Sequence, residues 1–189
     1  KFVQMVLNGE LVSTMITGDG GLGKTHTVLE ELKKAGLEEV DADLIEELEE
    51  GEVANVSGDY VIIKGYATPK ALYATLYENR NRLIIFDDCD SILMDPTALN
   101  ILKGALDSYN VRRISWLSKG FVDDGLPRSF EFKGRVIFIS NMSPDKIDKA
   151  VKSRTILTDL FMTLKDKIER MRFILPNILP NIAMDVKEA

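Results

Sequence analysis

The sequence predicts an α/β fold in which helices cover both faces of a mostly parallel sheet. Short apolar segments alternate along the chain with longer segments of helical periodicity. A glycine-rich turn at residues 18–25 joins the first apolar segment to a helix. A later apolar segment, residues 82–87, ends in acid. Such an alternation is typical of parallel sheets, whose functional groups gather where the strands end.

The core strands are expected where four to seven mostly apolar residues stand between turn or charged residues. Two further short strands, before the fourth core strand, flank a glycine-containing loop and predict a side β-hairpin. The five core strands are expected at residues 11–17, 60–63, 82–87, 135–140 and 156–161, and the hairpin strands at 112–118 and 128–132.

Helices are expected between these strands. Three of them open on a capping residue followed by proline, a strong start signal, and one ends at Gly36, a strong stop signal. A final helix is broken at Pro176. The expected helices cover residues 2–9, 24–35, 38–50, 68–79, 95–108, 143–154 and 164–175.

The composition is that of a folded globular chain, with 189 residues of which 45% are hydrophobic. No run of eighteen apolar residues occurs, so no membrane span is expected. One cysteine, Cys89, and one histidine, His26, exclude an internal disulfide and a zinc site with four N/S ligands. A reducing, cytoplasmic compartment is the natural interpretation.

The net charge of −6 hides an asymmetry along the chain. Residues 38–52 hold nine acidic side chains and no basic one, and without them the net charge becomes +3. The simpler interpretation of this acidic segment is a solvated helix face or loop. The alternative is an acidic surface for a basic partner.

Residues 18–25, GDGGLGKT, match the phosphate-binding pattern G-x-x-x-x-G-K-[ST] at every position. Glycines let the backbone direct several N–H groups toward one anion, and the following helix adds the positive end of its dipole. We expect Lys24 to contact the β- and γ-phosphates of ATP and Thr25 to bind Mg²⁺. His26 follows directly, and an ordinary helix residue is a simpler interpretation of it than a catalyst. The predicted nucleotide contacts are Gly18, Asp19, Gly20, Gly21, Leu22, Gly23, Lys24, Thr25 and His26.

A second feature of the predicted site is the strand that ends in Asp87 and Asp88. A phosphate-loop enzyme needs one acid at this edge to hold hydrated Mg²⁺ and another group to orient the attacking water. Asp87 fits the metal role and Asp88 the water role. Consecutive strand residues point to opposite faces, so the two carboxylates need not compete. Cys89 is interpreted as a small packed side chain rather than a nucleophile.

Four motifs stand in order along the chain: GDGGLGKT at 18–25, LIIFDDCD at 83–90, VIFISN at 136–141 and AVKSR at 150–154. Taken in this order, they resemble those of the AAA+ ATPase family over nearly the whole chain. The resemblance implies a three-layer P-loop NTPase fold of AAA+ type, with the hairpin before the sensor 1 strand. It implies that Asn141 is the sensor 1 residue, and that Arg154 is an arginine finger given to the neighbouring subunit's ATP site, usually in a ring of six. A capping asparagine and a surface arginine are the alternatives. Some phage-encoded AAA+ ATPases share this look.

Two departures from the family pattern matter. The second acid is usually Glu, whereas Asp88 is one methylene shorter, so water must bind closer or hydrolysis is slow. The family's helical lid carries a sensor 2 arginine, but Arg170 and Arg172 come too early for that role. We expect an AAA+ core at residues 1–163 and the start of a truncated lid at 164–189. Since the chain opens on Lys1 rather than Met, the natural N-terminus is expected upstream.

The macromolecular substrate stays open between protein and nucleic acid. The resemblance implies a pore loop at 64–66, where Tyr66 grips an extended protein chain or is instead a packed turn residue. Residues 112–133 combine basic side chains with Trp116 and Phe121, which suits a nucleic-acid backbone and bases and resembles superfamily III helicases. An amphipathic ribbon explains that pattern as well. The hypotheses are a protein-remodelling motor, a DNA-translocating or helicase-like ATPase, and a slow ATP-dependent assembly switch.

Overall fold

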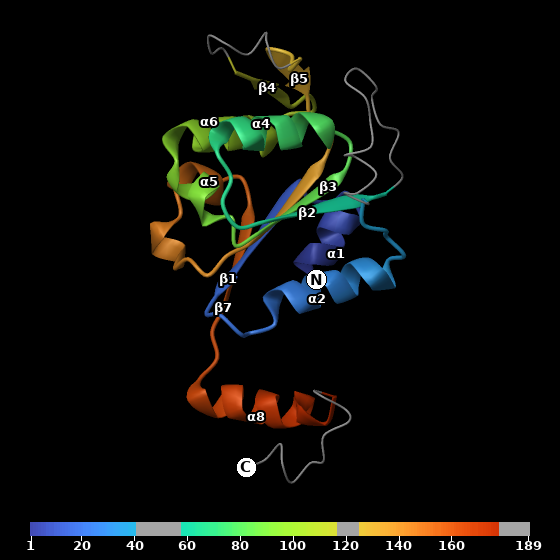
Figure 1. The fold of residues 1–189 in the computed structure, drawn as a ribbon. Coiled ribbons are helices and arrows are strands. Elements are labelled where there is room, and N and C mark those ends of the chain that lie inside the picture. The colour runs from blue at the N-terminus through green and yellow to red at the C-terminus, as the bar shows by residue number, and fades with distance from the viewer. Residues whose placement is uncertain (41–57, 117–124, 178–189) are drawn as a thin grey trace. The chain divides into compact units, whose positions relative to one another are not determined.

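The computed structural model describes residues 1–40, 58–116 and 125–177 (Figure 1). The chain divides into two compact units, Lys1–Asp159 and Leu160–Ala189. The elements follow one another as α1 (Phe2–Leu7), β1 (Ser13–Gly18), α2 (Lys24–Lys34), β2 (Tyr60–Lys64), α4 (Pro69–Glu78), β3 (Leu83–Asp87), α5 (Asp90–Met94), α6 (Pro96–Ala105), β4 (Arg113–Ser115), β5 (Ser129–Glu131), β6 (Arg135–Ile139), η2 (Pro144–Lys146), α7 (Lys149–Lys152), β7 (Ile156–Leu160), α8 (Leu164–Ile174) and η3 (Leu175–Asn177).

The main sheet has five strands in the order β2-β3-β6-β1-β7. Strands β2, β3, β6 and β1 are parallel neighbours, with Ile62 opposite Ile85 and Ile85 opposite Ile137. The predicted α/β fold with five core strands is therefore confirmed. Because β1, β3 and β6 are parallel, their carboxyl ends meet at one edge, which is where the phosphate loop and the acidic residues follow them.

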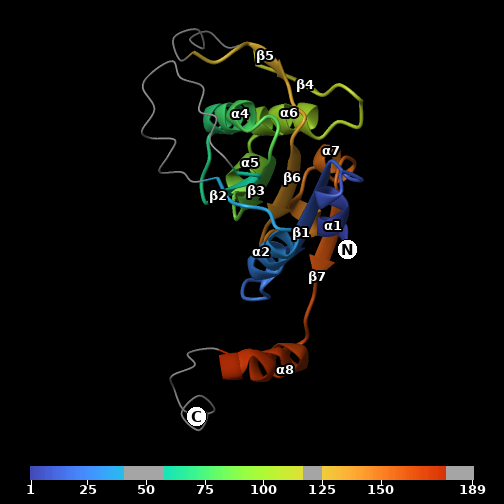
Figure 2. The same cartoon turned by 90° about the vertical axis from the view of Figure 1, so that its right-hand side faces the viewer.

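Two apolar layers enclose the sheet, and each uses alternate residues of the central strands. Leu83 and Ile85 of β3 pack with buried side chains of α1 and α2. Ile84 and Phe86 of the same strand pack with α4, α5 and α6 on the other face. Figures 1 and 2 show α1 and α2 on one side of the sheet and α4 and α6 on the other. The central strands β1, β3 and β6 are thus largely buried on both faces, whereas the edge strands β2 and β7 are only partly buried.

Side-chain caps fix the start of the two longer helices of the second layer. The Thr68 hydroxyl accepts a hydrogen bond from the N–H of Ala71, and Pro69 follows as the first helical residue. Asp95 accepts from the N–H groups of Thr97 and Ala98, at 2.7 and 2.9 Å. These caps satisfy donors that a helix otherwise leaves free at its first turn.

Several predicted boundaries need correction. The helix expected over 143–154 is wrong: the chain forms η2, becomes extended at Ile147 and Asp148, and starts again as α7. Ile147 is buried in the core, and the Asp148 carboxylate accepts the N–H of Ala150, so a new helix start replaces a continuous helix. Helix α5 was not expected, and α6 ends at Ala105 rather than near residue 108. The helix expected over 38–50 lies largely outside the described residues.

The side hairpin before β6 is confirmed, as the antiparallel pair β4 and β5. Its described strands are shorter than expected, and residues 117–124 are outside the described part. Phe130 of β5 packs edge-on against Tyr73 and Tyr77 of α4, with ring centroids 5.1 and 5.3 Å apart. The hairpin is therefore attached to the helical layer rather than to the main sheet.

The second unit contains α8 and η3. Thr163 and Asp166 form a reciprocal capping box at the start of α8: the Thr163 hydroxyl accepts from the N–H of Asp166, and the Asp166 carboxylate accepts from the N–H of Thr163. The Thr163 hydroxyl also donates to the Asp166 carboxylate at 2.6 Å, and this hydrogen bond, followed by the one from the N–H of Thr163, lowers the pKa of Asp166. None of the helices within 1–40, 58–116 and 125–177 has the length and apolarity needed to cross a lipid bilayer.

Candidate nucleotide-binding site

The loop between β1 and α2 has the backbone conformation that its glycines allow. Gly21 and Gly23 adopt φ angles of 77° and 74°, in the left-handed region that other residues rarely enter. Gly23 is also the N-cap of α2, so the eleven-residue helix begins immediately after the loop. This loop therefore presents a helix N-terminus, which attracts anions, at the edge of the sheet.

Lys24 is the most enclosed cation of the site, with only 6% of its surface exposed. Its ammonium donates to the backbone oxygens of Gly18 and Asp19, at 2.7 and 2.9 Å, and to Oδ1 of Asn141 at 2.7 Å. An ammonium has three N–H donors, and each has a partner here. Lys24 thus links the phosphate loop to the residue that follows β6.

Asn141 joins Lys24 to the acidic strand. While its Oδ1 accepts from Lys24, its Nδ2 donates to Oδ1 of Asp88 at 2.8 Å. Asp88 follows β3, and its N–H donates to the carbonyl of Ile139 in the neighbouring strand β6. The structure therefore brings Lys24, Asn141 and Asp88, which are far apart in sequence, into one hydrogen-bonded chain.

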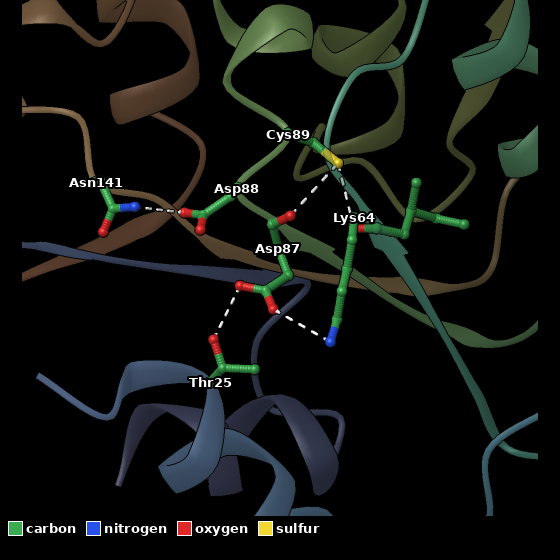
Figure 3. Close-up of polar contacts among 7 residues, drawn as sticks. Thr25, Lys64, Asp87, Asp88, Cys89 and Asn141 are labelled. Atoms are coloured by element: carbon green, nitrogen blue, oxygen red, sulfur yellow. Dashed lines mark hydrogen bonds and ion pairs between the residues drawn. The ribbon is translucent and has the colours of Figure 1, made fainter. Parts of the chain in front are cut away.

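Asp87 faces the first turn of α2 (Figure 3). Its Oδ1 accepts a hydrogen bond of 2.9 Å from the hydroxyl of Thr25, and its Oδ2 lies 4.0 Å from the ammonium of Lys64. A hydroxyl and a carboxylate side by side are hard oxygen ligands of the kind that Mg²⁺ takes, together with substrate phosphates and water. The two residues fit the predicted metal role.

A cavity of about 260 Å³ adjoins these groups. The loop forms one wall, and Asp88 and Asn141 line it as well, whereas Gly18, Asp19 and Asp87 do not. His26 also lines the cavity. The sequence pattern alone did not show whether this residue would lie at the site. The lining residues are Gly20, Gly21, Leu22, Gly23, Lys24, Thr25, His26, Asp88, Ile139 and Asn141.

Cys89 is buried beside the acids, with 3% of its surface exposed. Its Sγ lies 3.2 Å from the carbonyl of Ile63, to which the thiol can donate. Burial, followed by the negative charge of Asp87, raises the pKa of the Cys89 thiol to about 11. The thiol is therefore neutral near pH 7, which suits a packed side chain rather than a nucleophile.

Arg154 is the one predicted catalytic residue that does not join the others. It follows α7 and lines a different cavity, of about 370 Å³, with Glu10, Ser13 and Thr155. Its guanidinium donates to the carbonyl of Ala150 at 3.1 Å, and its Nε is buried without a hydrogen-bond partner. Arg154 and Lys24 thus line different cavities of the chain.

Lys64 is the neighbour of the acids that sequence reasoning did not assign to the site. It was considered only as part of the loop that carries Tyr66. The signal that could have found it is its place at the end of β2, opposite Asp87 in the parallel pairing with β3. The sequence alone does not reveal the register of the two strands, so it does not show that Lys64 lies beside Asp87.

The two candidate substrate segments differ in what they expose. Tyr66 is 82% exposed, which excludes the packed turn residue that was the alternative. In the hairpin region, Arg112 donates to the carbonyls of Ala105 and Gly134, and burial lowers its pKa. Trp116 packs edge-on against Tyr73. Arg112 and Trp116 thus contribute to packing, while Arg113 and Arg128 remain exposed; Lys119 and Phe121 are outside the described residues.

The sequence has a relative in Enterobacteria phage T4, described as an uncharacterized 36.7 kDa protein in the nrdC-mobD intergenic region. The two are 31% identical over 177 residues, which cover 86% of this chain and 49% of the phage protein. The chain thus spans about half the length of this relative. No protein-family model matches the chain.

Among solved structures, two mutant forms of RuvB from Thermotoga maritima are similar to this chain. Each has a TM-score of 0.54, with 15% and 14% sequence identity, and the similarity covers 93% and 94% of this chain. It covers only 48% and 47% of the RuvB chains. RuvB is an AAA+ P-loop ATPase, so the predicted fold class, a P-loop NTPase fold of AAA+ type, is confirmed.

Proposed function

We propose that this chain binds ATP with Mg²⁺ and hydrolyses it, as an AAA+ ATPase. The observation that carries the proposal is the hydrogen-bonded chain from Lys24 through Asn141 to Asp88, at the wall of a cavity formed by the phosphate loop. A glycine turn with a purely structural role does not require hydrogen bonds from a buried lysine to residues at the ends of two other strands. A site that senses a phosphate and activates a water does require such connections.

Each residue has a role that follows from its chemistry. Lys24 exchanges its contacts with backbone carbonyls and Asn141 for oxygens of the β- and γ-phosphates. Asn141, once released from Lys24, can donate to the γ-phosphate or hold the attacking water through its amide. Asp88 accepts a hydrogen bond from that water and orients it toward phosphorus. Thr25 and Asp87 would hold Mg²⁺, which would supply positive charge against the phosphates.

The direct test replaces Lys24. We expect Lys24→Ala to abolish ATP binding, because it removes the cation of the phosphate site; the measurement is equilibrium binding of a fluorescent ATP analogue. Lys34→Ala at the other end of α2 is the matched control, since Lys34 is exposed and forms an ion pair with Glu31 on the same helix. Thermal unfolding monitors whether each variant is folded. Normal affinity in folded Lys24→Ala would overturn the proposal.

The proposal extends to assembly: Arg154 completes the ATP site of a neighbouring copy in a head-to-tail ring, most simply a hexamer. The support is that Arg154 does not line the cavity formed by the phosphate loop of its own chain.

We also propose that residues 164–189 open a helical lid. A cytoplasmic site of action fits the single cysteine and the phage relative.

For the substrate we favour remodelling of a protein, because Tyr66 is exposed and borne on a loop next to the acidic strand. A DNA-translocating or helicase-like ATPase is the second candidate, supported by exposed Arg113 and Arg128 on the hairpin. Stimulation of ATP hydrolysis by single-stranded DNA, lost at high salt, is expected only for the second. ATP binding with almost no phosphate release would instead favour the assembly switch.

A further inference from the structure

We propose that Lys64 is a positioning residue that sets how strongly the site takes up Mg²⁺, by acting on the carboxylate of Asp87. Its ammonium supplies the counter-charge of Asp87 before the metal binds and opposes the metal electrostatically when it arrives. The inference rests on the proposed function, in which Asp87 is a Mg²⁺ residue, and assigns a role to a lysine outside the phosphate loop.

The first support is the register of the sheet. Lys64 is the last residue of β2 and lies opposite Asp87, the last residue of β3, in a parallel pair. Residues opposite each other on neighbouring strands project to the same face. The pairing of β2 with β3 therefore holds Lys64 beside Asp87, and no loop is needed to bring the two residues together.

The second support is how the two oxygens of Asp87 are used (Figure 3). Oδ1 accepts from the hydroxyl of Thr25 at 2.9 Å, and Oδ2 faces the ammonium of Lys64 at 4.0 Å. Figure 3 shows Thr25 and Lys64 approaching the carboxylate from different sides. One carboxylate oxygen of Asp87 thus contacts a residue of the phosphate loop, and the other faces a residue of β2.

The third support is the burial of Asp87, whose side chain is 9% exposed. A carboxylate removed from water needs a compensating charge or hydrogen bonds. Lys24 does not provide that charge directly, because its three N–H groups are directed to Gly18, Asp19 and Asn141. Among the described residues, Lys64 is the cation recorded in an ion pair with Asp87.

The direction of the effect follows from Coulomb's law. A positive charge beside a Mg²⁺ residue disfavours a second, doubly charged cation there. Because the Lys64 side chain is 65% exposed, solvent and salt screen this effect and keep it modest. Removing the charge should therefore make Mg²⁺ binding easier, in contrast to the loss expected when a phosphate-binding lysine is removed.

The test measures binding of a fluorescent ATP analogue by the whole chain over a series of MgCl₂ concentrations. In low-salt buffer, we expect Lys64→Met to lower the half-saturating MgCl₂ concentration about three- to tenfold. The shift should shrink in high salt, as expected for an exposed charge. Lys64→Arg keeps the charge and should restore the wild-type Mg²⁺ dependence.

Lys133→Met is the matched control. The Lys133 side chain is 67% exposed and pairs with Glu131 at 3.8 Å, on the hairpin rather than at the site. It should leave the Mg²⁺ dependence unchanged, which separates a local effect from a change in net charge.

An unchanged or raised half-saturating concentration in Lys64→Met, or an equal shift in Lys133→Met, would overturn the inference. So would weaker binding of the analogue by Lys64→Met when Mg²⁺ is removed with EDTA, because Lys64 would then bind phosphate. These results leave the proposed function intact. If the wild-type chain fails to bind the analogue at every MgCl₂ concentration, the proposed function fails, and this inference fails with it.

Discussion

Asp88 has an unusual backbone, with φ at 55°, and within the described residues no other non-glycine residue has a positive φ. Left-handed backbone costs most L-residues roughly 1–2 kcal/mol, whereas asparagine and aspartate tolerate it best. In this position the short side chain also places Oδ1 2.8 Å from the amide of Asn141. The backbone geometry therefore gives a physical reason why aspartate replaces the glutamate usual in the AAA+ pattern.

The expected results of two substitutions at Asp88 separate its chemical role from its backbone role. Asp88→Asn should fold normally and bind ATP but lower its hydrolysis about a hundredfold or more, because the water loses its acceptor carboxylate. Asp88→Glu keeps the charge but is less tolerant of left-handed backbone, so its free energy of unfolding should be about 1 kcal/mol lower than that of Asp88→Asn. Phosphate release and urea unfolding measure the two effects.

Undiminished hydrolysis by Asp88→Asn would assign water activation to another residue. A fully stable Asp88→Glu variant with faster hydrolysis would show instead that the backbone does not select aspartate.

At this scale the sequence predicted which residues gather at the strand ends, but not all of their partners. Lys24, Asp88 and Asn141 were predicted because each follows or precedes an element whose type the pattern determines. Lys64 was missed as a site residue, because its meeting with Asp87 depends on which strand lies beside β3 and in which register. A local sequence motif specifies neither the neighbouring strand nor the register.

At the scale of elements, the caps are the features most open to test. Oδ1 of Asp95 accepts two N–H groups at the start of α6, so Asp95→Ala should lower the free energy of unfolding by about 1 kcal/mol. Asp95→Asn is the control and should lose much less, since asparagine caps nearly as well. Urea unfolding of both variants is the measurement. Equal stability of Asp95→Ala and the wild type would mean that tertiary packing alone fixes the start of α6.

The quality of element prediction followed the strength of the local signal. The cap-then-proline pairs located the starts of α4 and α6 because side-chain capping is decided within four residues. The pair at Ser143 and Pro144 does mark the start of η2, but the predicted length was wrong, because burial of Ile147 in the core accompanies the end of that helix and burial is a tertiary property. Five core strands were predicted because short apolar runs bounded by turn or charged residues have a strong local pattern. Their spatial order was not predicted.

At the scale of the whole molecule, the proposed assembly rests on the position of Arg154. Lys24, Asp88 and Asn141 line one cavity and Arg154 another. The guanidinium of Arg154 donates to the carbonyl of Ala150, and its Nε is buried without a hydrogen-bond partner among the described residues. The separation of the two cavities is what supports the proposal that Arg154 works on a neighbouring copy.

Mixing two inactive variants tests that arrangement. Arg154→Ala and Asp88→Asn should each hydrolyse ATP poorly alone, since one lacks the proposed finger and the other the acid. In mixed assemblies, an intact Asp88 in one subunit can meet an intact Arg154 from the next, so phosphate release should recover at about a quarter of the interfaces of a random equimolar mixture. The rate at several mixing ratios is the measurement, with sedimentation to establish that assemblies form.

Lys152→Ala is the control and should hydrolyse ATP without mixing. It removes a neighbouring basic residue of α7, which contacts the carbonyl of Pro144. If intact assemblies of the two variants show no recovery at any ratio, Arg154 does not act across subunits.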